Sequence, residues 1–290
     1  MKYILVFFLF FNNLLFSLDL EISESRWEQF WKTFYSKPNN VTNQNFLSSY
    51  IGQTFINFNN NQSTKFTKIY NLEFWYGFIR INNEKRVGKF YQHQGEYVFL
   101  SNISNNFKTF EFNSTGVNTD SWRFGFGIND GYIFEIKDNK VYLSHSGAFT
   151  WIRNDFYNYN GDSLDIIFIK RYDEKMKFGM SSNIGIDLEL LKNLNLNIKQ
   201  EFANYYPDFD FFPWFLSYFT DLLFQRFPDI IEKELINLLD EYYPIYKIIY
   251  KSLYSIIISE IRKSNCYFPI NSEKSLQLNN LKIGVSIIFK

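Results

Sequence analysis

The sequence predicts a mainly β fold with helices: an antiparallel up-and-down β-barrel of about 8–10 strands, two N-terminal helices and a helical insertion before the last strand. Three observations lead to this fold. Apolar and polar residues alternate along successive segments joined by turn signals, one hairpin keeps that alternation over its whole length, and the first residues are typical of an exported protein. Strands joined in series leave two open edges, and closing the sheet removes them.

The N-terminus resembles a secretory signal peptide, assigned to residues 1–17. Lys2 precedes an apolar run that ends at Phe16, and Ser17 offers a cleavage point. A helical membrane anchor needs about 20 apolar residues in succession, and this run is shorter. We therefore expect export.

Residues 18–60 are expected to form two short amphipathic helices ahead of the barrel domain, which spans residues 61–290. Ser25 and Glu28 make a capping box for the first helix. In the second, apolar residues recur every three or four positions from Phe46 to Phe55. Packing, or a lid over one end of the barrel, is their expected role, and contact with the membrane surface is the alternative.

The strongest strand signal is the hairpin from Phe178 to Phe202, in which even positions are almost all apolar and odd positions polar. Residues that face each other in a hairpin share a side of the sheet, so Leu190 is expected opposite Leu194, with a three-residue loop between them. Asp187 and Lys199 then become diagonal neighbours within reach of a charge pair. Each arm of about 13 residues is long enough to cross a bilayer, although soluble sheets alternate in the same way.

Further period-two segments supply the other strands, and residues on their polar faces are expected to point into the lumen. The strand candidates are Phe66 to Phe78, Val87 to Leu100, Phe107 to Phe112, Trp122 to Ile128, Tyr132 to Lys137, Val141 to Ile152, Ser163 to Tyr172 and Leu281 to Phe289. Turn signals such as Asn129-Asp130-Gly131 are expected to join them. The lumen-facing candidates are Glu73, Arg123, Asp187, Glu189, Lys199 and Glu201.

Two resemblances point to the outer membrane. The final segment LKIGVSIIFK resembles the aromatic C-terminal strand that barrel insertion machinery reads in bacterial outer-membrane barrels, except that Phe289 is followed by Lys290. SWRFGFGINDGYIFEI, HSGAFTWIRNDF, FFPWFLSYF and YFPINSEKSLQLNNLKIGVSIIF resemble an uncharacterised group of predicted outer-membrane barrel proteins of the Bacteroidota and Ignavibacteria type. This second resemblance implies location and architecture, with membrane lipid and the insertion machinery as partners, and no particular chemistry.

Residues 207–275 form the helical insertion, which is too rich in Phe, Ile and Leu to remain a solvated loop. Its last helix, from Ile245 to Ile261, is apolar on most sides and has a polar stripe at spacing four. We expect the insertion to cover the barrel mouth or enter the lumen as a plug, with Trp214, Lys247 and Lys251 as plug residues. The two lysines are expected to face water or lumen acids such as Glu189 and Glu201.

Composition narrows the possible chemistry. The 30 Lys and Arg residues balance 30 Asp and Glu residues, which leaves no basic field for nucleic acid. Two histidines and one cysteine argue against a zinc site, and no phosphate loop or dinucleotide motif is present, so no cofactor is expected. Oligomeric state is left open.

Three functions remain. The first is a structural or closed outer-membrane barrel without enzymatic activity; the second is a soluble periplasmic or secreted barrel that binds an apolar ligand. The third is a barrel lipid hydrolase, for which Ser144, His145 and Ser146 occur together and Asp165 lies nearby. Neighbours on a strand point in opposite directions, so His145 is expected to diverge from both serines, and this disfavours the hydrolase.

Overall fold

Eight antiparallel strands pair in chain order and close into a barrel, because the last strand also pairs with the first. The computed structural model describes residues 41–58, 64–105, 116–136, 139–158 and 163–289. The predicted signal peptide, first helix and strand 107–112 lie outside these residues. The strands are β1 (Val41–Asn57), β2 (Ile69–Val87), β3 (Phe90–Ser104), β4 (Asn118–Ile136), β5 (Asn139–Tyr157), β6 (Met176–Leu191), β7 (Leu194–Tyr205) and β8 (Leu276–Phe289). The predicted antiparallel barrel is confirmed.

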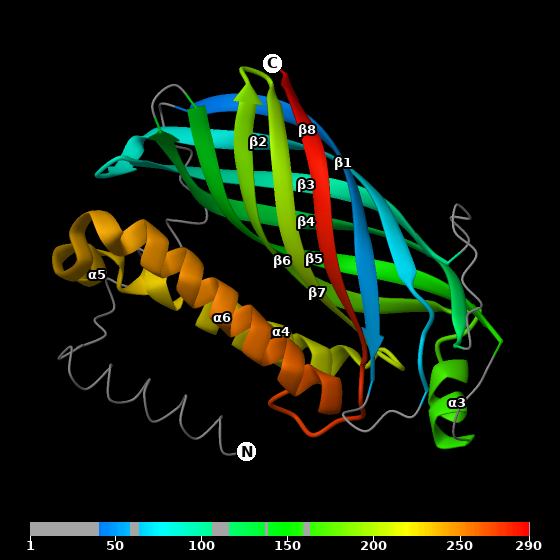
Figure 1. The fold of residues 1–290 in the computed structure, drawn as a ribbon. Coiled ribbons are helices and arrows are strands. Elements are labelled where there is room, and N and C mark those ends of the chain that lie inside the picture. Colours follow the sequence, from blue (N-terminus) through cyan, green and yellow to red (C-terminus); the bar gives the residue numbers. More distant parts are fainter. Residues whose placement is uncertain (1–40, 59–63, 106–115, 137–138, 159–162, 290) are drawn as a thin grey trace. The chain divides into compact units, whose positions relative to one another are not determined.

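The two ends of the barrel differ in their connections (Figure 1). At the short-turn end, β2 and β3 join through Gly88 and Lys89, and β6 and β7 join through Lys192 and Asn193. The long-loop end carries helix α3 (Ser163–Lys170) and the helical insertion between β7 and β8. The insertion consists of α4 (Phe211–Ile230), α5 (Glu232–Leu239), the short 3-10 helix η1 (Asp240–Tyr242) and α6 (Tyr243–Ser264). Within the described residues, no helix combines the length and apolarity needed to cross a membrane.

The predicted hairpin forms with the expected register. Ile186 faces Ile198 in the β6–β7 ladder, and Asp187 and Lys199 are diagonal neighbours whose charged groups lie 4.0 Å apart. Near the turn the register shifts by one residue, so that Leu191 pairs with Leu194. The loop therefore has two residues instead of the expected three.

The second predicted N-terminal helix is wrong, because its residues form β1. Phe46 and Tyr50 are buried inside the barrel, while Leu47 and Ile51 are exposed on its outer face. Both faces of β1 therefore carry apolar side chains. This blurs the period of two and produces the helix-like spacing in the sequence.

Two strand predictions also need correction. Residues predicted as the strand from Ser163 to Tyr172 form α3 instead and a turn after it, with Ile169 and Tyr172 fully buried. The segments on either side of Asn129-Asp130-Gly131 are one continuous strand, β4, instead of two strands with a turn between them. A Cβ on Gly131 would lie 2.0 Å from the carbonyl oxygen of Leu143, so this glycine permits close packing and makes no turn.

The lumen is filled by side chains in three successive zones. Towards the long-loop end, a buried apolar cluster includes Ile56, Ile103, Phe156 and Leu278. Ile169 of α3 and Tyr172 in the turn after it belong to this cluster. Towards the short-turn end, a second cluster contains an aromatic stack in which the rings of Trp75 and Tyr97 lie 4.0 Å apart. Charged residues lie between the two clusters on the same strands. The barrel therefore has a packed core along its length.

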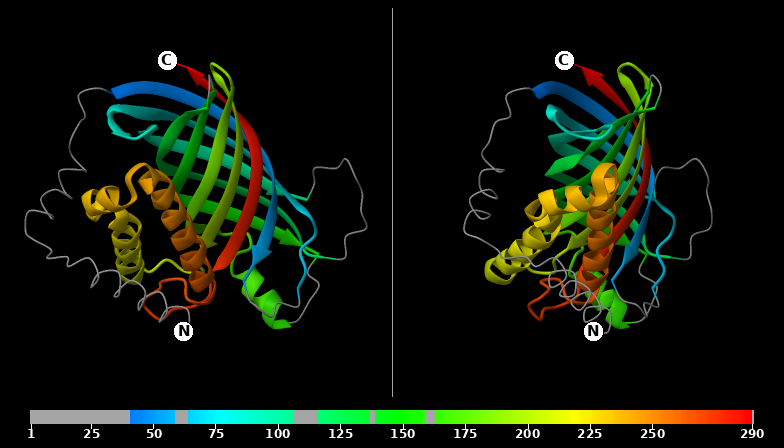
Figure 2. Two further views of the ribbon diagram at one scale, coloured as in Figure 1. Left: turned by 60° about the vertical axis from the view of Figure 1, so that its left-hand side comes forward. Right: turned by 90° about the vertical axis from the view of Figure 1, so that its left-hand side faces the viewer.

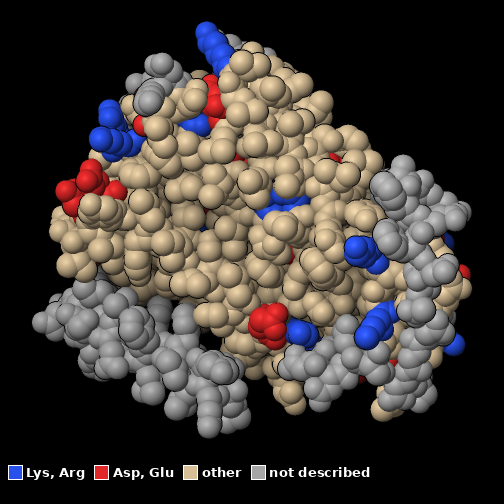
Figure 3. All heavy atoms as spheres, viewed as in Figure 1, with Lys and Arg blue, Asp and Glu red and all other residues tan. Residues whose placement is uncertain are grey.

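The outer face of the barrel is apolar. The alternate residues of each strand that point away from the lumen include many exposed large apolar side chains: Leu47, Ile51, Phe74, Tyr76, Val98, Leu100, Trp122, Phe124, Ile186, Ile198, Leu281, Ile283, Val285 and Ile287. Figure 3 shows a mostly uncharged face over β6 to β8 and α6, with charged atoms mainly towards its edges. Such a surface is far more apolar than that of a water-exposed sheet.

The helical insertion packs against the outside of the barrel wall, which makes the predicted lumen plug wrong (Figures 1 and 2). Arg123 and Asp130 are seven residues apart on β4, so their side chains leave opposite faces of the sheet. Arg123 lies in the lumen, and Asp130 on the outer face binds Lys251 of α6. It is α3, at the long-loop end, whose apolar side chains close the lumen.

Candidate functional site

Helix α6 turns its polar stripe towards the barrel wall. Lys247, Lys251, Ser255 and Ser259 recur at spacing four and, with Arg262, are all buried. The opposite side of the helix is apolar and exposed, and it includes Ile245, Ile249, Leu253 and Ile257. A helix on the surface of a soluble protein has the reverse distribution, with its apolar stripe facing the core.

The polar side chains of this stripe contact polar side chains that point outward from the barrel wall. The Ser255 hydroxyl lies 2.8 Å from Nε2 of His145 on β5. The Lys251 ammonium donates to a carboxylate oxygen of Asp130 on β4 at 2.5 Å, and Asp130 directly faces His145 in the β4–β5 ladder. The other carboxylate oxygen of Asp130 is 3.9 Å from Nδ1 of His145. A serine, a histidine and an aspartate thus lie in sequence on three different elements.

The far end of α6 makes a neutral polar contact with the wall. Ser259 accepts hydrogen bonds from the side-chain amides of Asn204 on β7, at 3.0 Å, and of Gln277 on β8, at 2.8 Å. Asn204 is three residues from Glu201, which lies in the lumen, so it projects outward. The polar residues on this part of the outer wall are therefore the ones that α6 covers.

A second ion pair fastens α4 to α6. Arg262 contacts Asp221 at 2.7 Å and the Ser217 hydroxyl at 2.8 Å, and the Tyr254 hydroxyl donates to Asp221 at 2.8 Å. All of these side chains are buried. The two helices therefore form a hairpin with polar contacts on the inside.

The plug candidates all belong to this outer assembly. Lys247 pairs with Asp229 at the end of α4, and its ammonium lies 5.5 Å from the ring centre of Tyr132 on the outer face of β4. Lys251 lies 3.9 Å from Asp229 in addition to its bond with Asp130. Trp214 packs on the outward ring of Phe149, with ring centres 6.0 Å apart. The expected contacts of the lysines with Glu189 and Glu201 are therefore wrong.

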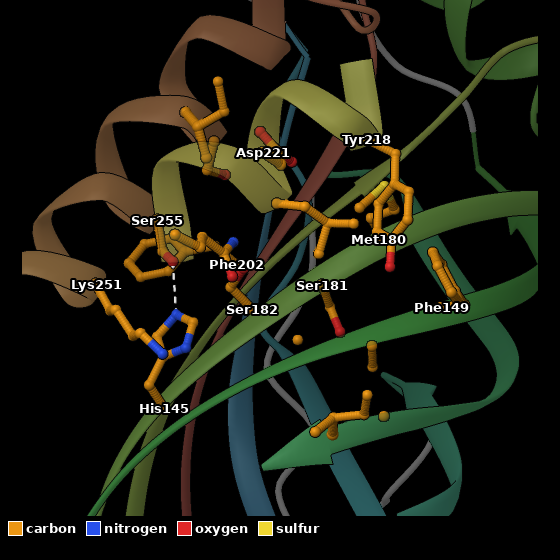
Figure 4. A pocket seen from close by; sticks show the side chains of 18 of the residues that line it. His145, Phe149, Met180, Ser181, Ser182, Phe202, Tyr218, Asp221, Lys251 and Ser255 are labelled. Carbon is orange, nitrogen blue, oxygen red and sulfur yellow. Dashed lines mark hydrogen bonds between the residues drawn. The ribbon is translucent and has the colours of Figure 1, made fainter. Parts of the chain in front are cut away.

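A cavity of about 150 Å³ lies between the helical hairpin and the wall formed by β4 to β7. His145, Lys251 and Ser255 line it, and Figure 4 shows His145 and Ser255 facing each other beside it. Gly147 is two residues along β5 from His145, and a Cβ at Gly147 would meet no atom within 4 Å. The wall is thus hollowed beside the histidine.

Three of the lumen-facing candidates form a separate cluster with a fourth charged residue, Lys282. Arg123 on β4 bonds Glu73 on β2 and Glu201 on β7. Lys282 on β8 contacts the same two carboxylates, at 2.7 and 3.0 Å. Their side chains are at most 1% exposed, so two cations and two anions balance inside the barrel. Lys282 was missed by sequence analysis, although it stands on the polar face of the last strand.

The remaining candidates lie towards the short-turn end of the lumen. Lys199 pairs with Asp187 and lies 4.3 Å from the ring centre of Trp75. Glu189 accepts a hydrogen bond from the backbone amide of Lys140 at 3.1 Å. Every lumen-facing candidate belongs to the inward-pointing set of its strand.

Ser144, His145, Ser146 and Asp165, the residues of the disfavoured hydrolase alternative, do not meet, as expected. Ser144 and Ser146 point into the lumen, where Ser146 contacts the Tyr97 hydroxyl at 3.0 Å, while His145 points outward. Asp165 lies on α3 and accepts the backbone amide of Thr64. The residues that do meet His145 are Asp130 and Ser255, which sequence analysis missed. Two sequence patterns indicate these residues. Polar residues occur at outward positions of strands that are otherwise apolar on that face, and α6 carries a polar stripe at spacing four.

Among the described residues, no group of three or more His, Cys, Asp or Glu could hold a metal ion.

No family model and no curated protein matches the sequence. Among solved structures, the chain is similar to Neisserial surface protein A, with a TM-score of 0.37 and 10% identity over 86% of this chain and 99% of that one. It is also similar to Ail, the attachment invasion locus protein of Yersinia pestis, with a TM-score of 0.31 and 7% identity over 85% and 98% of the two chains.

Proposed function

We propose that the protein is an outer-membrane β-barrel with a closed lumen, embedded in lipid together with its helical hairpin. The observation that carries the proposal is the inverted distribution of side chains. Apolar residues cover the outside of both the strands and α6, while charges are enclosed in the lumen and between α6 and the wall. Water would favour the opposite arrangement, and hydrocarbon favours this one.

Strand length supports the same proposal. Strands of 16 to 19 residues, such as β2, β4, β5 and β6, exceed the roughly 9–11 residues that a tilted strand needs to cross the hydrocarbon core. The exposed apolar residues lie along the middle of these strands, for example Trp122 to Ile128 within β4. The ends of the strands can therefore reach the aqueous layers on both sides.

The packed lumen favours a role other than open-pore transport. Two apolar clusters flank the charge cluster of Glu73, Arg123, Glu201 and Lys282, so an ion would have to displace packed side chains to pass. Paired charges also leave no field of one sign to select permeant ions. The proposed barrel is a scaffold that presents its outer wall and the helical hairpin to lipid.

The same proposal includes three further points. The protein is located in the outer membrane, it is assembled by the barrel insertion machinery, and it is related to predicted barrels of the Bacteroidota and Ignavibacteria type. The soluble, ligand-binding alternative requires water to solvate the apolar outer face, which the side-chain distribution disfavours. Within the lumen, the space that such a ligand would need is occupied by Trp75, Tyr97 and Phe99.

Fractionation of expressing cells tests the proposal. We expect the protein in the outer-membrane fraction, resistant to alkaline carbonate and faster on gels before boiling than after. Purified protein in planar bilayers should show no steady conductance. Recovery in the soluble periplasm would contradict membrane embedding, and regular channel openings would contradict the closed lumen.

A further inference from the structure

Ser255, His145 and Asp130 stand in the order of a nucleophile, a base and a carboxylate that orients the base. The Ser255 hydroxyl is 2.8 Å from Nε2 of His145, within the distance at which a base can take its proton. Asp130 lies on the other side of the ring, 3.9 Å from Nδ1. Catalytic hydrogen bonds are often long before substrate binds, so this separation is compatible with an orienting role.

Lys251 fixes the carboxylate that faces the histidine. Its ammonium holds one oxygen of Asp130 at 2.5 Å, and the other oxygen is the one directed towards His145. Lys251 and Ser255 are one helical turn apart on α6, so one rigid element places both the nucleophile and the cation that positions the carboxylate. Asp130 and Lys251 are thus positioning residues in this arrangement.

The cavity beside Ser255 has the character of a site for an apolar chain. Phe126, Ile128 and Phe149 line it together with the polar residues, and Phe126 and Ile128 are also 49% and 59% exposed on the outer face of the barrel. The cavity is therefore continuous with the surface that would meet lipid. The bare backbone at Gly147 adds room next to the histidine.

A buried hydrogen-bond donor without a partner also lines the cavity. Arg262 contributes to the lining, and its Nε is buried without a hydrogen-bond partner among the described residues. Such an unused buried donor costs free energy unless something completes it. A carbonyl oxygen of a bound ester is a suitable acceptor.

We propose that this site hydrolyses acyl esters of membrane lipids, with Ser255 as the nucleophile and His145 as the general base. The Ser255 oxygen attacks the ester carbonyl carbon while its proton passes to Nε2 of His145. The bond from the carbonyl carbon to the lipid alcohol then breaks, and His145 returns the proton to the departing alcohol. Water, activated by His145, cleaves the acyl-serine, which releases a fatty acid and restores Ser255.

The identity of the substrate as a membrane lipid rests on the proposed function, in which the barrel is embedded in a membrane. Ester cleavage by Ser255 and His145 does not depend on that location. A short-chain nitrophenyl ester and a serine-reactive fluorophosphonate, added to the full-length protein folded in detergent, test the site without a membrane. Phospholipid vesicles then test the lipid substrate. Failure to fractionate with the outer membrane, with ester cleavage intact, would reject the location alone.

The serine variants give the sharpest comparison. We expect the fluorophosphonate to label Ser255, and Ser255→Ala and His145→Ala to lower ester cleavage by at least about 100-fold. Ser252→Ala is the matched control, because Ser252 lies on the same helix, is not among the residues that line the cavity and donates its hydroxyl to the backbone carbonyl of Ile248 within α6. Its activity should stay within about threefold of the parent. Faster migration before boiling identifies folded variants.

Two more variants separate positioning from folding. Asp130→Asn keeps the size of the side chain and should lower kcat with little change in KM, since it removes the charge beside the histidine and leaves the volume of the cavity unchanged. Gly147→Leu fills the hollow and should shift preference from long to short acyl esters. The proposal is overturned if the folded parent is neither labelled nor active, if the label is on another serine, or if Ser255→Ala keeps parental activity. Cleavage of short esters without release of fatty acid from vesicles would reject the lipid substrate.

Discussion

Arg123 on β4 holds Glu201 on β7 across the lumen through two hydrogen bonds of 3.0 and 2.7 Å. The two strands are not neighbours in the sheet, so this pair ties opposite parts of the wall together. Neither side chain has appreciable contact with solvent. Arg123 also bonds Glu73, so two buried carboxylates share it, as they share Lys282.

Replacement of Arg123 by Met should therefore destabilise the barrel by about 3–5 kcal/mol, because it leaves Glu73 and Glu201 with Lys282 alone. Urea titration in detergent, followed by the shift in gel migration between folded and unfolded forms, measures this loss. Arg123→Met combined with Glu201→Gln should recover part of it, because the double variant restores the charge balance.

An exposed ion pair supplies the control. Arg80 and Glu96 are 3.3 Å apart on the neighbouring strands β2 and β3, with side chains 52% and 56% exposed. Arg80→Met should cost at most about 1 kcal/mol, since a solvent-exposed pair gains little. Similar losses for the two arginine variants would contradict a special role for the buried cluster.

The two faces of β6 offer a second prediction. Ile186 is exposed on the outer face, so Ile186→Arg should impair assembly by roughly 2–4 kcal/mol near the middle of a bilayer. Glu189→Gln, on the lumen side of the same strand, should be tolerated because the glutamine carbonyl can still accept the hydrogen bond from the backbone amide of Lys140. Asp187→Arg is a poorer control, because it would place a second cation beside Lys199. Folding yield into vesicles compares them, and equal small losses would favour a solvated sheet.

Sequence analysis succeeded where one side of a strand is apolar and the other polar. In the β6–β7 hairpin this contrast predicts both the register up to the turn and the Asp187–Lys199 pair, and both are present in the structure. It failed in β1, where Tyr50 fills the lumen and Ile51 faces outward, so that both sides are apolar. A filled barrel in lipid removes the contrast on which the period of two depends.

The outer site was missed for a different reason. Asp130, with Gly131, resembles a turn in the sequence, yet it continues β4, where it pairs with His145 of β5, and it binds Lys251 of α6, 121 residues away. No local pattern reports such a partner. His145 was judged against its chain neighbours Ser144 and Ser146, whose divergence from it is confirmed, while its actual partner Ser255 lies on a distant helix. Tertiary packing, not strand geometry, brings these groups together.

The contact between α4 and α6 leads to a third prediction. Arg262→Met removes the cation that pairs with buried Asp221 and should loosen α4 by about 3–5 kcal/mol. Lys263→Met is the adjacent control. Lys263 lies 3.7 Å from Glu260, whose side chain is half exposed, so its loss should change the free energy of unfolding by less than about 0.5 kcal/mol. The rate of hydrogen exchange of the α4 backbone amides in detergent measures the effect of each variant. Comparable exchange in the two variants would show that the Asp221 pair does not hold the hairpin together.

The last prediction separates a helical cover on the outer wall from a plug. Tyr205 and Leu276 are paired at the ends of β7 and β8, so a short Gly/Ser loop can replace residues 207–268 and leave the strands joined. Because α4 to α6 lie outside the barrel, this deletion should not open a pore, and planar bilayers should record no steady conductance.

The deletion should instead lower the yield of folded protein in vesicles, because it leaves Asp130 and His145 facing lipid on the outer wall without Lys251 and Ser255. Asp130→Leu together with His145→Leu should then raise the yield of the deletion variant, whereas the same two changes in the full-length chain should lower it by leaving Lys251 without Asp130. The two leucines should thus raise the folding yield of the deletion variant and lower that of the full-length chain, and this reversal is the decisive result. If the helices lay inside the lumen, their deletion would not change how leucine at these outward positions affects the folding yield. Steady conductance by the folded deletion variant would contradict the outer position of the helices.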